Sequence, residues 1–483
     1  MIHWPNLFRI LGLFSLALSL TLALPLGYAL WAQDAGIMPL ALAAGISALL
    51  GALLQIVFRP VPVEFNNREG ILLVILTWAA AGLLGALPFY FSTHFPTLTD
   101  AVFESISGFT TTGATVLADI EALPESLLLW RSLIQWVGGM GIILLGIAIL
   151  PLIGGGGMEL YRAEFSGARS EKLKPRIAET ALSLWKIYVA FSLFQYVALR
   201  LAGLSPFHSI CHTFTTMATG GFSTRNASIG AFQSPVIEWI IIFFMIIAGI
   251  NFTQHYRLFI ERNPKRFLCD IEVRGFLTCL ASASLALAVT LYYHQDGTVA
   301  QQLRQAVFQV VSITTGTGYS SADFGAWVPF AQLILLALMF AGGCTGSTTG
   351  GLKIARLILL KRVVGREFRR IVERRGVFAV RLNGKAVSES AIQSLLNLVY
   401  LAFLINFAAS LALTAFGVDI LTAISAVAAA MFNVGPGLGL VGPSENYAFL
   451  AAPAKWLLSF CMLAGRLEYY SLLVIATRAF WRK

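Results

Sequence analysis

The sequence predicts an all-α protein that crosses a membrane many times, with four pseudo-symmetric helix–pore loop–helix units around one pore. Three observations support this prediction. The 483 residues are 57% hydrophobic and only 12% charged, whereas a soluble domain has about 25% charged residues. Apolar stretches near the roughly 20 residues that cross a bilayer recur along the whole chain. Between the later stretches lie four short segments rich in threonine and glycine.

We expect ten membrane helices, of which the eighth is cut short. They cover residues 7–31, 38–58, 71–91, 129–153, 183–203, 235–256, 275–293, 328–341, 391–416 and 454–477. The first two form an amino-terminal hairpin, and the rest form four units. The divisions are 1–69 for the hairpin and 70–160, 161–270, 271–385 and 386–483 for the units. No small-residue cleavage site follows the first apolar stretch, so we expect no cleavable signal peptide.

Positive charge is concentrated in alternate connections between these helices. About 28 of the 34 Lys and Arg residues lie at the two ends of the chain or in residues 59–68, 162–186, 257–274 and 353–385. Lys and Arg gather on the cytoplasmic side of membrane proteins, so we place both termini in the cytoplasm. The net charge of +10 therefore reflects membrane topology, and we expect no nucleic-acid binding. The opposite connections contain acidic residues, including Asp100, Glu104, Glu121 and Glu445, which we expect to raise the cation concentration at an outer mouth.

The four polar segments follow short helices and resemble one another. Loop 1 is TTTGAT (110–115), loop 2 is TTMATGGFS (215–223), loop 3 is ITTGTGYS (313–320) and loop 4 is NVGPGLG (433–439). The helices before them are expected to start at Thr99 or Asp100, at Ser205, at Asp296 and at Asp419. Alignment on a central glycine pairs Gly113, Gly220, Gly316 and Gly435.

Irregular backbone at membrane depth is tolerated only where protein buries it or water lines it. Glycine permits the backbone angles that direct successive carbonyls toward one axis, and rings of carbonyls replace the hydration shell of a potassium ion. The carboxyl ends of the short helices carry partial negative charge, which favours a cation. The candidate potassium-binding residues are Thr111, Thr112, Gly113, Thr219, Gly220, Thr315, Gly316, Thr317, Asn433, Val434 and Gly435.

With four such loops in order and an extra amino-terminal hairpin, the whole chain resembles the TrkH family, within the wider TrkH/KtrB/HKT group of potassium transporters. The resemblance implies potassium-selective uptake across the bacterial inner membrane, since glycine at all four central positions goes with selectivity over sodium. It also implies a homodimer with a pore in each protomer, and a cytoplasmic ring of TrkA-type subunits. That partner, and not this chain, would bind a nucleotide (ATP/ADP or NAD). Loop 4 departs most from the pattern, because Asn433 and Val434 replace threonines.

Segment 339–353, MFAGGCTGSTTGGLK, interrupts the second helix of the third unit. Its glycines, at about 1 kcal/mol each, disfavour a continuous helix. It could be an ordinary helix end at the inner surface. The preceding apolar stretch at 328–341 is too short to cross, however, so we expect an intramembrane gate, as the resemblance also implies. The gate residues would be Gly342, Gly343, Gly346, Ser347, Thr348 and Gly350, together with Arg466.

Arg466 lies eleven residues after Lys455 and twelve before Arg478, near the middle of the last expected helix. A charge at that depth costs about 2.5–3.5 kcal/mol unless it is satisfied. An arginine extending to the interface is the alternative, although neither end is close. The resemblance implies that Arg466 faces the pore, where carbonyls of residues 343–349 could bind it. Glu468 is two residues away and should face elsewhere on a helix.

The remaining sequence patterns say less about function. GxGxxG at 437–442 lacks the preceding strand of a dinucleotide site, and the five scattered cysteines form no CxxC pair. His208 and His212 are interpreted as packing or vestibule residues. The basic segment 361–375 is either a topology signal or a surface for the partner. The sequence has no clustered set of His, Asp, Cys or Ser-His residues that would indicate an enzyme. The alternative function is a secondary symporter that couples potassium to protons or sodium, for which Glu468 is the one candidate acid at membrane depth.

Overall fold

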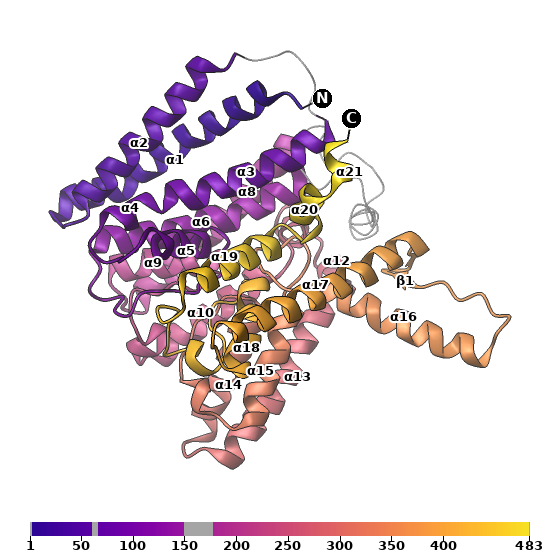
Figure 1. Cartoon of the computed structure of the whole chain (residues 1–483). Helices are drawn as coiled ribbons and strands as arrows, with labels where there is room; N and C mark the ends of the chain where they lie inside the picture. Colours follow the sequence, from indigo (N-terminus) through magenta and orange to yellow (C-terminus); the bar gives the residue numbers. More distant parts are fainter. Residues whose placement is uncertain (1, 60–65, 149–176, 483) are drawn as a thin grey trace.

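The computed structural model describes residues 2–59, 66–148 and 177–482. In this part of the chain nearly all regular structure is helical, apart from a hairpin of Arg381–Leu382 (β1) and Lys385–Ala386 (β2). The two termini lie side by side at one end of the molecule (Figure 1). The Arg68 side chain donates a hydrogen bond to the Arg482 carbonyl there.

Six described helical spans are long and apolar enough to cross a membrane. They are α1 (Trp4–Ala32), α2 (Ile37–Val57), α3 (Asn67–Gly85) continued by α4 (Leu87–Phe91), α8 (Ile177–Leu201), α13 (Ile271–His294) and α17 (Glu389–Ala415). The helices expected at 129–153 and 328–341 correspond to α6 (Glu125–Ala148) and α15 (Pro329–Ala341). The end of the first, 149–153, and the basic residues 162–176 lie outside the described residues.

Two further spans are broken, so the prediction of continuous helices at 235–256 and 454–477 is wrong. The chain bends by 100° between α10 (Pro235–Gly249) and α11 (Phe252–Phe259), and by 115° between α19 (Ala452–Arg466) and the segment of α20 (Tyr470–Leu473) and η4 (Val474–Ala476). At the first bend, the Asn251 side chain accepts a hydrogen bond from the Thr253 amide (2.8 Å) and caps α11. At the second, Glu468 and Tyr469 have φ of 59° and 48°, which ends the helix.

Four short helices lead into the four loops. They are α5 (Leu98–Phe109), α9 (Pro206–Met217), α14 (Val299–Thr314) and α18 (Ile420–Met431). Ser205 and Asp419 cap α9 and α18 as predicted. The other two starts are corrected, because Thr97 caps α5 and Thr298 caps α14. Buried apolar residues of α5, α14 and α18 belong to the main apolar cluster, and α9 packs against it through Phe207 and Phe214.

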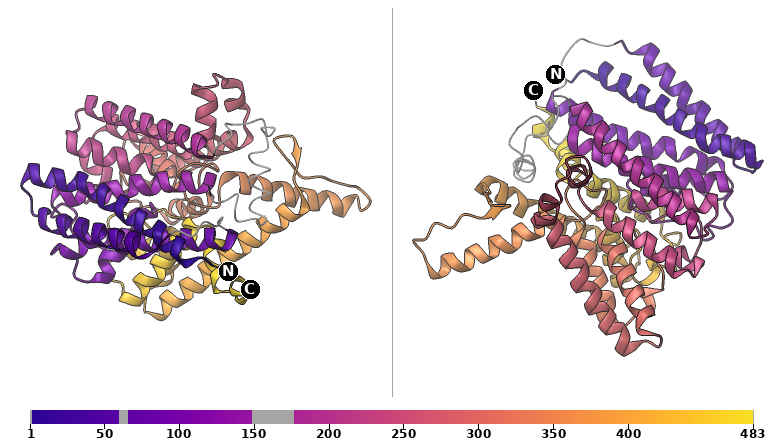
Figure 2. Two further views of the ribbon diagram at one scale, coloured as in Figure 1. Left: turned by 90° about the horizontal axis from the view of Figure 1, so that it is seen from above. Right: turned by 180° about the vertical axis from the view of Figure 1, so that it is seen from behind.

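Two hairpins lie at the periphery of the molecule (Figures 1 and 2). The α1–α2 hairpin is peripheral in all views (Figures 1 and 2), and its helices approach closely where a Cβ on Gly51 would lie 2.8 Å from the Gly12 carbonyl. The second is an arm of α16 (Ile354–Val372), followed by the β hairpin, that projects from the body. The remaining elements are η1 (Ser228–Phe232), α12 (Pro264–Cys269), η2 (Phe324–Ala326), η3 (Gly439–Val441) and α21 (Arg478–Trp481).

Candidate functional site: a ring of four loops

The four loops have one backbone pattern. In each, one amide donates a 2.8 Å hydrogen bond to the carbonyl five residues earlier; the donors are Thr112, Gly220, Thr317 and Val434. The residue before each donor has a positive φ; these residues are Thr111, Thr219, Gly316 and Asn433. The residue after each donor also has a positive φ, and in all four loops it is a glycine: Gly113, Gly221, Gly318 and Gly435. These four glycines are therefore structurally equivalent.

This pattern corrects the alignment made from the sequence. Gly220 lies one position before the equivalent glycine of its loop, and Gly316 lies two positions before. Loops 2 and 3 each contain two glycines, and the sequence alone does not say which one faces its neighbours. The register is decided by where the preceding helix ends, at Met217 for α9 and at Thr314 for α14.

Close backbone contacts join the loops into a closed ring. A Cβ added to Gly113 would overlap the Gly220 carbonyl, one on Gly221 the Thr317 carbonyl, and one on Gly318 the Val434 carbonyl. A Cβ on Gly435 would lie 2.6 Å from the Thr112 carbonyl oxygen, which returns the circuit to loop 1. Only glycine combines these approaches with positive φ. Backbone carbonyls gathered in this way can replace water around a monovalent cation.

A cavity of about 100 Å³ lies at the ring, and the four equivalent glycines are among its lining residues. Arg225 also lines it and forms a 2.7 Å ion pair with Glu121, both about 40% exposed. The hydrogen bond from Arg225 holds the pKa of Glu121 below its ordinary value of 4.5. Glu445 is a further acidic residue of this lining.

Two of the acids expected at the outer mouth are instead buried. Glu104 pairs with Arg131 at 2.6 Å, and both side chains are almost fully enclosed. Arg131 also donates to the Ser223 carbonyl in loop 2 (2.9 Å), and Glu104 accepts from the Thr115 hydroxyl in loop 1 (2.9 Å). Asp100 pairs with a buried lysine of α19, Lys455, at 2.6 Å. Since these charges are neutralised behind the ring, they support the loops and do not attract ions at the mouth.

Segment 339–353 lies directly against the ring. The Thr348 hydroxyl donates to the carbonyl of Met217 (3.2 Å), the last residue of α9, and accepts from the Thr219 hydroxyl of loop 2 (3.3 Å). On the opposite side of the ring, a Cβ on Gly350 would overlap the Phe432 carbonyl, just before loop 4. The segment therefore contacts the second and fourth units at once.

The same segment also forms hydrogen bonds with α10, α11 and α13. The Cys344 amide donates to the Gly249 carbonyl at the end of α10 (2.8 Å), and the Phe252 amide at the start of α11 donates to the Gly346 carbonyl (3.1 Å). The break between α10 and α11 thus supplies both a donor and an acceptor to segment 339–353. The Thr345 amide donates to the Glu272 carboxylate at the start of α13 (2.5 Å).

Arg466 is buried, with 3% of its surface exposed. Its guanidinium donates to the Thr348 carbonyl at 2.9 Å and to the Gly138 carbonyl of α6 at 3.4 Å. The expected contact with carbonyls of residues 343–349 is present. Glu468 faces in another direction from Arg466, as expected. The reason is that α19 ends before Glu468, whose carboxylate accepts hydrogen bonds from Arg356 at 2.9 and 3.0 Å.

Comparison with known proteins agrees with this architecture. A family model described as a TrkH cation transport protein matches residues 40–483. The chain belongs to the TrkH family. It is 41% identical to the Trk system potassium uptake protein TrkH of Salmonella typhimurium and to that of Escherichia coli K12, over the full length of each chain. Its fold matches the crystal structure of the potassium transporter TrkH from Vibrio parahaemolyticus with a TM-score of 0.92, at 37% identity and full coverage of both chains.

Within this TrkH fold, the sequence-based list of loop residues missed Gly221 and Gly318. A count of residues from the end of each short helix would have found them, had those ends been known. The interpretation of His208 and His212 as packing or vestibule residues agrees with their contacts. His208 bonds to the Thr224 hydroxyl just after loop 2 (2.8 Å), and His212 bonds to the Ser223 hydroxyl at the end of loop 2 (3.1 Å).

Proposed function

We propose that this TrkH-family chain takes up potassium selectively through the ring of four loops. The observation that carries the proposal is the closed circuit of backbone contacts through Gly113, Gly221, Gly318 and Gly435. Side chains are excluded from these contacts, so backbone carbonyls are the groups available to an ion on the axis. The four short helices end at the ring, where their partial negative charge favours a cation. Relatives of the chain are named potassium uptake proteins.

The proposed filter consists of the loop residues expected from the sequence, together with the two glycines that the alignment missed. These residues are Thr111, Thr112, Gly113, Thr219, Gly220, Gly221, Thr315, Gly316, Thr317, Gly318, Asn433, Val434 and Gly435. The membrane voltage is a sufficient driving force, at about 2.3 kcal/mol per charge per 100 mV, or roughly 50-fold accumulation. Transport, and not catalysis, is the proposed activity, and potassium is its cargo.

The proposed gate is segment 339–353 with Arg466. Its contacts to Met217 and Phe432 place backbone across the inner side of the ring, and Arg466 adds a positive charge that repels cations. The proposed gate residues are Gly342, Gly343, Gly346, Ser347, Thr348 and Gly350. Opening requires this segment to leave the contacts that it makes with the second and fourth units.

The α16 arm is the proposed docking surface for a cytoplasmic TrkA-type ring, which would bind the nucleotide itself. The arm begins at Ile354, directly after segment 339–353, so a force on the arm reaches the gate through continuous chain. Phe368 and Ile371 are 64% and 71% exposed among its basic residues, a combination suited to a protein partner. We place the protein as a homodimer in the bacterial inner membrane with both termini cytoplasmic, and we assign it no nucleic-acid partner.

The test is ion flux in proteoliposomes that contain the purified chain alone, under a set voltage and no other gradient. Potassium, rubidium, sodium and lithium are compared for the unmodified protein and for Gly113→Ser. Voltage-driven flux of potassium and rubidium, with sodium admitted only by the variant, supports the proposal. Sodium and potassium fluxes that are equal in the unmodified protein contradict it.

Flux that requires a proton or sodium gradient would instead support the secondary symporter. The acid considered for that mechanism, Glu468, is engaged by Arg356, so a proton taken up there would have to break an ion pair. If a folded preparation shows no flux, the TrkA-type partner is added with nucleotide; flux that remains absent in that complex counts against the gate and partner assignment.

A further inference from the structure

The four loops are not held in the same way. Loops 1 and 3 each contain a pair of threonine hydroxyls in mutual hydrogen bonds, Thr110 with Thr112 (2.8 Å) and Thr315 with Thr317 (2.7 Å). In the shared register, the equivalent positions of loops 2 and 4 are Ala218 with Gly220, and Phe432 with Val434. None of these four side chains has a hydroxyl, so loops 2 and 4 lack the internal bond.

Loop 2 is held instead by Gln135 of α6, whose side chain is fully buried. Its amide nitrogen donates to the Gly220 carbonyl at 2.6 Å, and its amide oxygen accepts from the Phe222 backbone at 3.1 Å. A Cβ on Gly220 would overlap the Gln135 amide, which explains a glycine at this position. One side chain therefore fixes the loop on both sides of Gly221.

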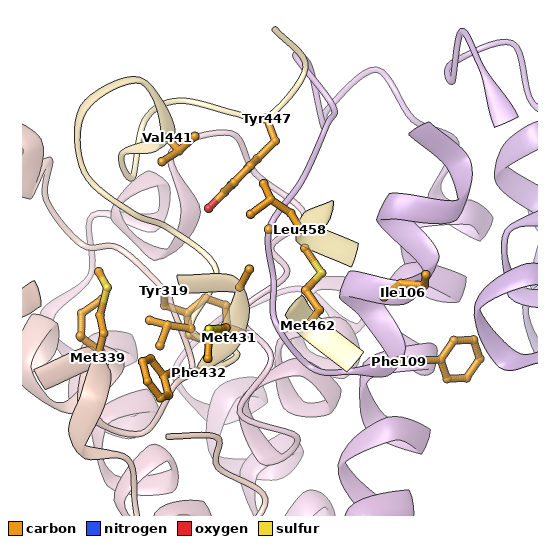
Figure 3. Packing of buried hydrophobic residues seen from close by; sticks show 14 of the residues in the cluster. Ile106, Phe109, Tyr319, Met339, Met431, Phe432, Val441, Tyr447, Leu458 and Met462 are labelled. Atoms are coloured by element: carbon orange, nitrogen blue, oxygen red, sulfur yellow. The ribbon is translucent and has the colours of Figure 1, made fainter. Parts of the chain in front are cut away.

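Loop 4 is held by Tyr447, which is 2% exposed. Its hydroxyl donates to the carbonyl of the ring residue Gly435 at 2.7 Å, and its amide donates to the Thr115 carbonyl of loop 1 at 2.8 Å. In Figure 3 the hydroxyl oxygen lies at the inner end of the Tyr447 ring, toward the centre of the packed cluster. The aromatic ring of Tyr447 packs against that of Phe103 in α5, with the two ring centroids 5.6 Å apart.

We propose that Gln135 and Tyr447 are positioning residues for ion selectivity, so that the ring is braced with twofold and not fourfold symmetry. The order of ring contacts, 1–2–3–4–1, makes loops 2 and 4 opposite each other. Each of the two side chains donates to one loop carbonyl, Gln135 to that of Gly220 and Tyr447 to that of Gly435. A carbonyl oxygen has two lone pairs, so the second remains for an ion.

The inference rests on the proposed function, because it assigns two residues to the ring proposed as the filter. A buried carbonyl that loses its donor is free to rotate toward a smaller ion or toward water. Loops 1 and 3 would keep their threonine pairs, so loss of one brace affects one side of the ring. The ring then discriminates less well against sodium, while the fold is retained.

The experiment measures the ratio of potassium to sodium flux in proteoliposomes for Tyr447→Phe and Gln135→Met. Each change removes the donor and leaves the volume nearly the same. We expect the ratio to fall about threefold to tenfold in each, the range that loss of one buried hydrogen bond produces. The control is Ser15→Ala, which removes a buried hydroxyl bond of 2.9 Å to the Leu11 carbonyl in α1, on the peripheral α1–α2 hairpin; its ratio should not change.

An unchanged ratio in both brace variants, with potassium flux retained, overturns the inference. So does an equal fall in the Ser15→Ala control, which would indicate general loosening of the fold. If Gln135→Met does not fold, Tyr447→Phe decides, because it removes a single hydroxyl donor and leaves every other contact of the residue in place. If the unmodified protein does not prefer potassium, the proposed function fails and the inference fails with it. If the unmodified protein prefers potassium and Gly113→Ser reduces that preference, the proposed function stands. An unchanged flux ratio in Tyr447→Phe then overturns the inference alone.

Discussion

Substitution of single glycines in loop 3 tests the register of the ring. Gly316→Ala and Gly318→Ala add the same methyl group two residues apart, and both positions have positive φ, 68° and 76°. The sequence alignment placed Gly316 in the ring, whereas the structure places Gly318 there. The structure therefore predicts that Gly318→Ala is much the more damaging change.

The magnitudes follow from the surroundings of the added Cβ. At Gly316 the nearest atom, the Asn433 carbonyl oxygen, lies 3.0 Å away, and the equivalent residues of the other loops, including Thr111 and Thr219, already have side chains at positive φ. The expected cost is the left-handed backbone penalty, about 1–2 kcal/mol. At Gly318 the same penalty is joined by overlap with the Val434 carbonyl, which adds about 1–3 kcal/mol of overpacking.

The assay combines thermal unfolding in detergent with the potassium-to-sodium flux ratio in proteoliposomes. Gly318→Ala should lower both the melting temperature and the ratio, while Gly316→Ala should change them slightly. An equal loss in the two variants, or a greater loss in Gly316→Ala, would refute the register and with it the ring contacts between loops 3 and 4.

Three further predictions concern charged residues. Arg466→Ala removes charged hydrogen bonds worth about 1.5–3 kcal/mol, so potassium flux at matched expression should rise about tenfold or more; unchanged flux would remove Arg466 from the gate. Arg131→Met leaves the Glu104 carboxylate buried and unpaired, and should destabilise the protein by about 3–5 kcal/mol in denaturant unfolding, with partial recovery when Glu104→Leu is added; no loss would contradict the buried pair. The depressed pKa of Glu121 means that its pairing with Arg225 contributes stability above pH 4.5 and loses it as pH falls through the lower folded value. The small difference in melting temperature between the unmodified protein and Glu121→Gln should therefore shrink as the pH falls below 4.5, and a difference that grows on acidification would contradict this sign.

Much of the site could be predicted because short-range signals define it. Threonine–glycine segments between apolar helices are conspicuous, and Ser205 and Asp419 cap their helices as local chemistry requires. Thr97 was missed as the cap of α5, although it lies only two or three residues from the two residues considered. Local preference alone does not separate several polar residues in a row.

The breaks in the two bent spans were missed for a different reason. Residues 235–256 and 454–477 are apolar enough to continue as helices, and hydropathy does not distinguish a straight helix from one that turns by 100°. The bend after Gly249 is stabilised by contacts with segment 339–353, about 90 residues later in the sequence. A contact between residues so far apart in the sequence cannot be recognised from a short stretch of that sequence.

The sequence by itself determined the membrane class, the four repeated loops, the interrupted helix at 339–353 and the buried position of Arg466, because composition and spacing fix which segments enter the bilayer. Only the tertiary structure decided which glycines meet, which acids are neutralised, and which side chains hold each loop. Gly318 is in the ring because its backbone meets the Val434 carbonyl, more than 100 residues away in the sequence. Glu104 is a buried residue and not one of the outer mouth because it pairs with Arg131. Such pairings depend on packing between distant elements, where close contact and desolvation set the energy and no local pattern records them.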